Sequence, residues 1–111
     1  MISFAIATAL YAVSMQASAT VQPRKNFAAC LDRVTKKSLQ DKVEPSAFEA
    51  AARSACAAEE TAFKKAMVDY DVSMKIARAR AEQDAQLQVE DYLATRKDAY
   101  QMYFESGSLP K

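Results

Sequence analysis

Residues 24–56, RKNFAACLDRVTKKSLQDKVEPSAFEAAARSAC, decide the fold of this chain. On each side of the short segment 41–45, apolar residues recur at the three- and four-residue spacing of a helix, with charged residues between them. This pattern predicts a first helix over about 24–40 and a second helix from about residue 46. Because the connection is short, the two helices must be antiparallel neighbours.

The two cysteines of the chain, Cys30 and Cys56, stand at equal sequence distances from Val43, near the middle of the connection. In an antiparallel hairpin such residues lie level with each other, so the sequence predicts a disulfide between them. A loop of about 25 residues closed by a disulfide gains roughly 3.5 kcal/mol on the chain-entropy model. A redox role would need an exposed thiol of low pKa, and a zinc site would need further ligands, so a structural bond is the favoured interpretation.

The second helix has a predicted start and a predicted end. Ser46 and Glu49 stand in the capping-box arrangement, in which each side chain bonds the backbone amide of the other residue. Neither glycine nor proline occurs from Ser46 to Ser106, and Gly107 can take the left-handed conformation that ends a helix. The sequence therefore predicts a long helix over about 46–105 and a tail over 106–111.

A heptad seam runs along the first half of this long helix and would need a cover. It is formed by Phe63, Met67, Tyr70, Met74, Ala77 and Ala81. The first helix is too short to cover it, so two all-α folds remain open. In the favoured one, the disulfide-stapled antiparallel hairpin continues into an unbroken C-terminal helix, whose seam pairs with a second copy as a coiled coil. In the alternative, the helix breaks within 69–73 or near 82–84 and folds back into a compact three-helix bundle.

The first 22 residues contain no charged side chain. An apolar stretch of about 12 residues is followed by Ala17-Ser18-Ala19, which has the small-x-small form of a signal-peptidase site. We therefore expect a signal peptide over 1–19, cleaved after Ala19. The mature protein would be a single helical domain over 20–111, periplasmic or secreted, with no stable membrane span. An uncleaved membrane anchor and a buried N-terminal helix are the alternatives.

The residue types present argue against several functions. The net charge is +1, with both signs interspersed, so a nucleic-acid partner is not expected. Without histidine, and with a single glycine, the chain offers no metal, nucleotide or haem motif, and no cofactor is expected. Neighbouring carboxylates such as Glu59-Glu60 and Glu90-Asp91 point away from each other on a helix, so we expect no catalytic residue and no enzyme.

Large aromatic and methionine side chains are the remaining functional signal, because both are common in surfaces that bind proteins. The candidates for a partner or homodimer surface are Phe63, Met67, Tyr70, Met74, Tyr92, Tyr100, Tyr103 and Phe104. The alternative is that they fill the core. The function predicted is a protein-interaction or structural module of the cell envelope. A small inhibitor or immunity-type protein and a periplasmic holdase-like chaperone are the alternatives.

Overall fold

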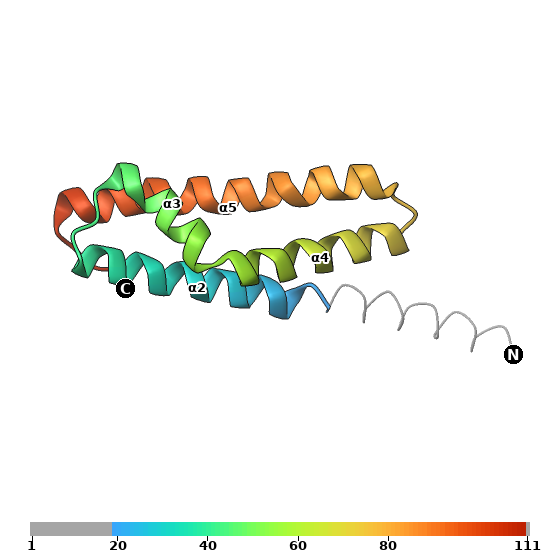
Figure 1. The fold of residues 1–111 in the computed structure, drawn as a ribbon, viewed down its shortest axis with the longest axis horizontal. Coiled ribbons are helices and arrows are strands. Elements are labelled where there is room, and N and C mark those ends of the chain that lie inside the picture. The colour runs from blue at the N-terminus through green and yellow to red at the C-terminus, as the bar shows by residue number, and fades with distance from the viewer. Residues whose placement is uncertain (1–18, 111) are drawn as a thin grey trace, which may run out of the picture.

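The computed structural model describes residues 19–110, and this part of the chain is entirely helical and irregular, without strands (Figure 1). The helices are α2 (Val21–Gln40), α3 (Pro45–Ala55), α4 (Ala57–Ser73) and α5 (Arg78–Ser106). The predicted all-α class is confirmed. The predicted signal peptide lies outside the described residues, apart from Ala19.

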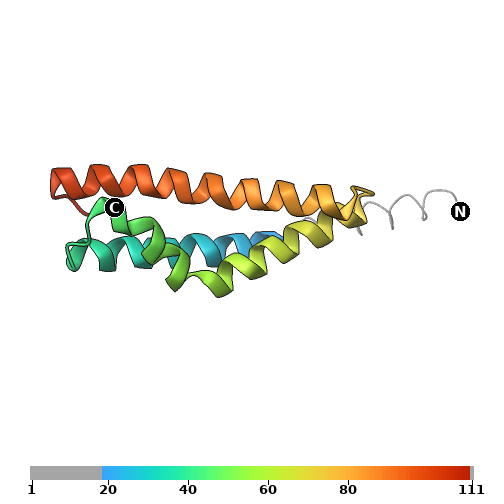
Figure 2. The same ribbon diagram turned by 45° about the horizontal axis from the view of Figure 1, so that its top comes forward.

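The helices form a three-armed bundle in which α3 and α4 together make one bent arm. They run antiparallel to α2, and α5 then returns along the whole length of α4 and α3 (Figures 1 and 2). The hairpin of α2 with the following helix is as predicted. The unbroken helix over about 46–105 is wrong, because the chain turns at 74–77, immediately after the first of the two predicted break segments, and folds back as in the alternative.

The turn after α4 is a Schellman motif built on a lysine. Lys75 has a positive φ of 69°, the Ile76 amide donates to the Asp71 carbonyl at 3.0 Å, and the Lys75 amide donates to the Val72 carbonyl at 3.1 Å. The turn after α2 repeats this arrangement, with Lys42 at φ 56°. Glycine is the usual residue at such a position, which is why the sequence shows no stop signal there.

The start of α3 differs from the predicted capping box. Pro45 occupies the first turn after the extended residue Glu44, whose φ is −61° and ψ 143°, and no side chain caps the helix. Proline suits this place because it has no amide hydrogen to satisfy and its φ is already helical. Glu49 instead approaches Arg53, with 3.4 Å between a carboxylate oxygen and a guanidinium nitrogen.

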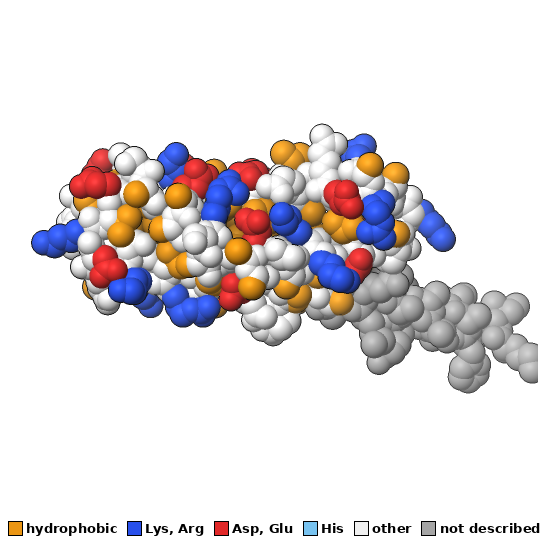
Figure 3. Space-filling view, viewed as in Figure 1, with side chains coloured by type: hydrophobic (Ala, Val, Ile, Leu, Met, Phe, Trp, Pro, Cys, Tyr) orange, Lys and Arg blue, Asp and Glu red, His pale blue; other side chains and the backbone are white. Residues whose placement is uncertain are grey.

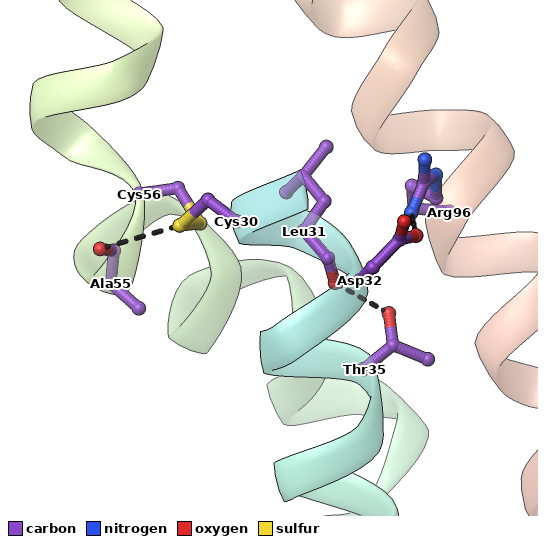
Figure 4. Close-up of a disulfide and its surroundings, with 7 residues drawn as sticks. All are labelled: Cys30, Leu31, Asp32, Thr35, Ala55, Cys56 and Arg96. Carbon is purple, nitrogen blue, oxygen red and sulfur yellow. Dashed lines mark hydrogen bonds and ion pairs between the residues drawn. A yellow bond between two sulfur atoms is a disulfide. The ribbon is translucent and has the colours of Figure 1, made fainter. Parts of the chain in front are cut away.

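A bend at Cys56 separates α3 from α4 (Figure 2). Its φ of −111° and ψ of 21° leave the helical region, and the bend falls at the residue that the disulfide ties to α2. The predicted bond between Cys30 and Cys56 is confirmed, with an S–S distance of 2.03 Å and a Cα–Cα distance of 5.9 Å (Figure 4). Both cysteines are buried, so the bond is part of the core.

The main core lies along the line where α2, the bent arm of α3 and α4, and α5 meet. At its centre the rings of Phe27, Phe63 and Tyr92 come from α2, α4 and α5, with centroids 5.7 to 5.9 Å apart. Toward the turn at 74–77, where only α4 and α5 continue, the core narrows to Val68 and the small residues Ala81 and Ala85. The small side chains of Ala81 and Ala85 allow α5 to approach α4 closely in this part of the bundle.

Removal of the disulfide tests its share of the stability. We expect the Cys30→Ala/Cys56→Ala double variant to unfold with about 3.5 kcal/mol less free energy than the oxidised protein, because the unfolded chain loses its loop constraint. Urea denaturation followed by circular dichroism measures the difference. Wild-type protein under reducing conditions is the control and should lose a similar amount; equal stability of all three samples would contradict the prediction.

Lys42 and Lys75 both take the left-handed backbone conformation, and this yields a second prediction. We expect Lys42→Gly to raise the free energy of unfolding by about 0.5 to 1 kcal/mol, because glycine adopts a positive φ without a steric penalty. Lys42→Ala removes the same side chain but keeps the penalty, so it serves as the matched control and should bring no gain. A gain of equal size in both variants would show that the side chain, and not the backbone conformation, is responsible.

Candidate interaction surface

The structure divides the eight predicted surface residues between the core and two ends of the molecule, and Met67 and Tyr70 are partly buried along α4. Phe63 and Tyr100 are each 0 % exposed, and the half-buried Tyr92 packs on Phe63. Along α4 the seam is covered by α5 of the same chain, so the fold needs no second copy to bury it. Met74 lies exposed at the turn between α4 and α5. Tyr103 and Phe104 remain half-exposed near the end of α5.

Tyr100 holds the end of α5 against the turn between α2 and α3. Its ring stacks on Phe48 with centroids 4.2 Å apart and planes 3° apart, and its hydroxyl donates to the Val43 carbonyl at 2.5 Å. Burial, followed by the nearby Glu44 carboxylate, raises the pKa of Tyr100 above its ordinary value. This side chain was predicted as part of a binding surface, but its contacts make it a structural support for that surface.

A shallow groove of about 320 Å³, which we call the C-terminal groove, lies beside this support. Its lining residues are Leu39, Lys42, Tyr103, Phe104, Gly107, Ser108 and Leu109. Gly107, with φ 70°, ends α5 as predicted and directs the tail across the end of α2. Leu109 is 62 % exposed. The groove therefore combines half-buried aromatic walls with an apolar side chain that lies in solvent.

An ion pair borders the same end of the molecule. Arg96 of α5 binds Asp32 of α2 (Figure 4), and both residues line a second hollow on the other side of Tyr103. The pair joins the two helices whose ends form the C-terminal groove. It was not predicted from the sequence, because the two residues lie 64 positions apart and no local spacing relates them.

Arg53 forms ion pairs with three carboxylates, one each from α3, α4 and α5. Its guanidinium nitrogens lie 3.4 Å from Glu49, 3.9 Å from Glu60 and 2.6 Å from Glu90. The hydrogen bond from Arg53 lowers the pKa of Glu90, and the same bond raises the pKa of Arg53. Glu60 and Glu90 approach the same guanidinium from two helices, and Glu60 also pairs with Lys64. This arrangement joins α3, α4 and α5.

Two acids of α4 have a lysine four positions later, a spacing that allows an ion pair on a helix. Glu60 and Lys64 form such a pair at 3.4 Å. Asp71 and Lys75 form no ion pair within the described part of the chain, because Lys75 has left the helix at the turn. Across residues 19–110 no group of three histidine, cysteine or carboxylate side chains has the arrangement of a metal site. In the same range no helix is both long and apolar enough to cross a bilayer.

The raised pKa of Tyr100 predicts how stability depends on alkaline pH. A tyrosine whose folded pKa lies above its unfolded pKa stabilises the fold below the unfolded value, near 10, and this contribution is lost as pH rises through the folded pKa. We expect Tyr100→Phe to unfold with about 1 kcal/mol less free energy at neutral pH, because the hydroxyl bond to Val43 is gone. The deficit should shrink above pH of about 10, because Tyr100 then ionises in the unfolded wild-type chain before it ionises in the folded protein.

Urea denaturation across the pH series measures both effects. Tyr103→Phe, which changes a half-exposed tyrosine on the same helix, is the matched control and should keep the wild-type pH profile. Parallel profiles for wild-type and Tyr100→Phe would contradict the prediction.

No family model matches this sequence, and no curated protein or solved structure is significantly similar to it. Of the eight predicted surface residues, the most exposed, Met74, and the aromatic Tyr103 and Phe104 lie at opposite ends of the bundle, and the C-terminal groove is the end with the aromatic side chains. Its walls are held by the stacked Phe48 and Tyr100 and by the ion pair of Asp32 with Arg96.

Proposed function

We propose that this protein is an exported, non-catalytic helical module that binds a protein partner through the C-terminal groove. One observation carries the proposal. Of the aromatic side chains near the end of α5, Tyr100 is buried as a support, whereas Tyr103 and Phe104 line an open groove next to the exposed Leu109. Aromatic side chains beside exposed aliphatic ones are typical of protein-binding surfaces, where they give large contact area with little loss of side-chain entropy.

The chemistry of the groove restricts the partner. Its walls are apolar or aromatic, and Lys42 is the single charged side chain among its lining residues. A complementary partner would insert an apolar side chain between Tyr103 and Leu109 and place a carboxylate near Lys42. Such a partner segment fits a shallow surface hollow better than a small polar metabolite does, because small-molecule sites are usually deeper and enclose most of their ligand.

The groove is also preorganised. The Val43 carbonyl bonded to Tyr100 belongs to the turn that carries Lys42, so the hydroxyl holds α5 and this turn together. The disulfide further fixes α2 against the bend between α3 and α4. A surface held in its binding conformation loses less entropy on association. This rigidity supports a recognition role.

Non-catalytic function is part of the proposal and rests on the described side chains. The carboxylates that meet across the bundle are engaged in ion pairs, Glu90 with Arg53 and Glu60 with both Arg53 and Lys64. A hollow of about 460 Å³ is lined by Ala19 and by one face of α4, and its one carboxylate, Asp69, is paired with Lys65 at 2.6 Å. Export is proposed from the apolar N-terminal segment and the site after Ala19, and an oxidising compartment would suit the disulfide.

A small inhibitor-like protein is the second candidate, and the stapled, compact bundle favours it. An inhibitor of this kind would present the C-terminal groove as a rigid surface to an enzyme, so it differs from the first candidate only in the partner. The holdase-like alternative is less well supported. It needs apolar surface open to unfolded clients, whereas Phe63, Leu93 and Val89 are buried within one chain.

Site-specific photocrosslinking tests the proposed groove. A photoreactive amino acid is placed at Leu109, which lines the groove, or at Leu87, which is 58 % exposed on another part of α5 and serves as the matched control. In the cells that produce the protein, we expect one discrete crosslinked partner from position 109 and none from position 87. Crosslinks of equal yield from both positions, or none from position 109, would refute the groove as the binding site.

The captured partner then allows an affinity measurement. We expect Tyr103→Ala to weaken binding by about tenfold or more, because it removes one aromatic wall. Leu87→Ser should change the affinity less than twofold. If the partner is an enzyme and its activity falls on binding, the inhibitor-like candidate is supported over a purely structural module.

A further inference from the structure

The turn between α4 and α5 forms the opposite end of the molecule from the C-terminal groove (Figure 1). Met74 is 45 % exposed and Ile76 is 37 % exposed there, although both are large apolar side chains. The same segment carries three cations, Lys75, Arg78 and Arg80, and all three are exposed. We call these five residues the α4–α5 tip. Figure 3 shows basic and hydrophobic side chains close together over this end.

The charge of the tip has one sign. Residues 72–81 contain three cations and no carboxylate, and the nearest acids, Asp71 and Glu82, belong to the helices behind the turn. Lys75 and Arg78 form no ion pair within the described chain, and Arg80 approaches Asp84 at 3.6 Å while both remain exposed. Residues 33–40 of α2 also contain three cations and no carboxylate, but that segment has no exposed large apolar side chain, so the combination of both features distinguishes the tip from it.

The fold itself directs the turn's side chains outward. Lys75 takes the left-handed conformation at φ 69°, so the chain reverses between Met74 and Ala77. Of the described helices only α4 and α5 meet at this turn, and the core beneath the tip is made of Val68, Ala81 and Ala85. Within the described residues, Met74 and Ile76 are exposed where these two helices join.

The N-terminal part of the chain joins the bundle at the same end. Ala19, the first described residue, lines a hollow together with Asp69, Tyr70 and Ser73, close to the turn. The 18 residues that precede Ala19 carry no charged side chain, which is the composition of a segment that a bilayer accepts. Before the expected cleavage after Ala19, insertion of this segment would bring the α4–α5 tip to the bilayer surface.

We propose that the α4–α5 tip docks on an anionic phospholipid surface, with Met74 and Ile76 entering the interfacial region and Lys75, Arg78 and Arg80 facing the headgroups. Cations beside exposed apolar side chains are the combination that such interfaces bind. A nucleic acid would use the cations but would gain little from Met74 and Ile76. This inference goes beyond the proposed protein-binding function, because it concerns the other end of the bundle and can fail independently.

Vesicle binding of the chain from Thr20 tests the proposal, since this chain contains every residue of both core clusters and lacks the apolar N-terminal segment that would bind lipid by itself. We expect co-sedimentation with vesicles that contain phosphatidylglycerol and none with vesicles of phosphatidylcholine alone. Neutralising the tip with Lys75→Gln/Arg78→Gln/Arg80→Gln should reduce the partition coefficient by about tenfold or more. Added salt should weaken binding as well.

The matched control neutralises three exposed cations of α2 instead, as Arg33→Gln/Lys36→Gln/Lys37→Gln, and should keep more than half of the wild-type binding. Because the chain has no tryptophan, Met74→Trp supplies a single reporter, whose emission should shift to the blue on addition of anionic vesicles. Leu87→Trp is the control for this measurement and should show no shift. Circular dichroism checks that each variant keeps the wild-type helix content.

Three results would overturn the proposal. Wild-type protein could fail to bind anionic vesicles, or the α2 variant could lose as much binding as the tip variant, which would indicate a general charge effect. Duplex DNA could bind with the same dependence on the three tip cations while Met74→Trp shows no shift, which would indicate a polyanion site and not a lipid surface.

Discussion

The apolar seam of α4 needs a cover, and this requirement organises the rest of the structure. α2 begins beside the second half of α4 and supplies Phe27 and Leu31 to the main core, but it does not extend to the far end of α4. The remaining cover comes from α5, whose Ala81, Ala85, Val89 and Leu93 follow one face of that helix. Each buried aliphatic or aromatic side chain contributes about 1.5 to 3 kcal/mol, so an uncovered seam would cost most of the stability of a domain this small.

The folding back of α5 determines what the surface can offer. It places Phe63, Tyr92 and Tyr100 inside a single chain, and it leaves partly or fully exposed apolar side chains at the two ends of the bundle. At one end, Tyr103 and Phe104 line a groove whose walls are joined by the Tyr100 hydroxyl and the Asp32–Arg96 pair. At the other end, Met74 and Ile76 stand among three cations. An elongated bundle with chemically different ends suits a module that connects two binding partners, and the two proposals use one end each.

Charged side chains in the middle of the bundle have a structural role. Arg53 joins α3, α4 and α5 through Glu49, Glu60 and Glu90 at the level of the bend. All four groups are partly exposed, so solvent screens the pairs and their net contribution is small, about 1 kcal/mol or less for each pair. Their value lies in specificity, because a shifted register of α5 would separate Glu90 from Arg53 and remove the shortest of the three contacts.

The sequence by itself determined the all-α class, the hairpin and the disulfide. Helical spacing of apolar residues on both sides of a short connection implies antiparallel helices, and the equal distances of Cys30 and Cys56 from that connection imply that they meet. It also identified Gly107 as the end of the last helix and residues 69–73 as a weak segment. These are local properties, and they follow from periodicity, chain geometry and residue propensity.

Only the tertiary structure decided that the chain turns at 74–77 and folds back. The sequence offers no glycine there, and the heptad phase continues across the break, so a continuous helix with a second copy was locally equivalent. The choice depends on a balance between the steric cost of a left-handed Lys75 and the burial gained when α5 covers the seam. The long-range pairs, Arg53 with Glu90 and Tyr100 with Val43, depend on the same turn. Such contacts join residues far apart in sequence, and no local pattern encodes them.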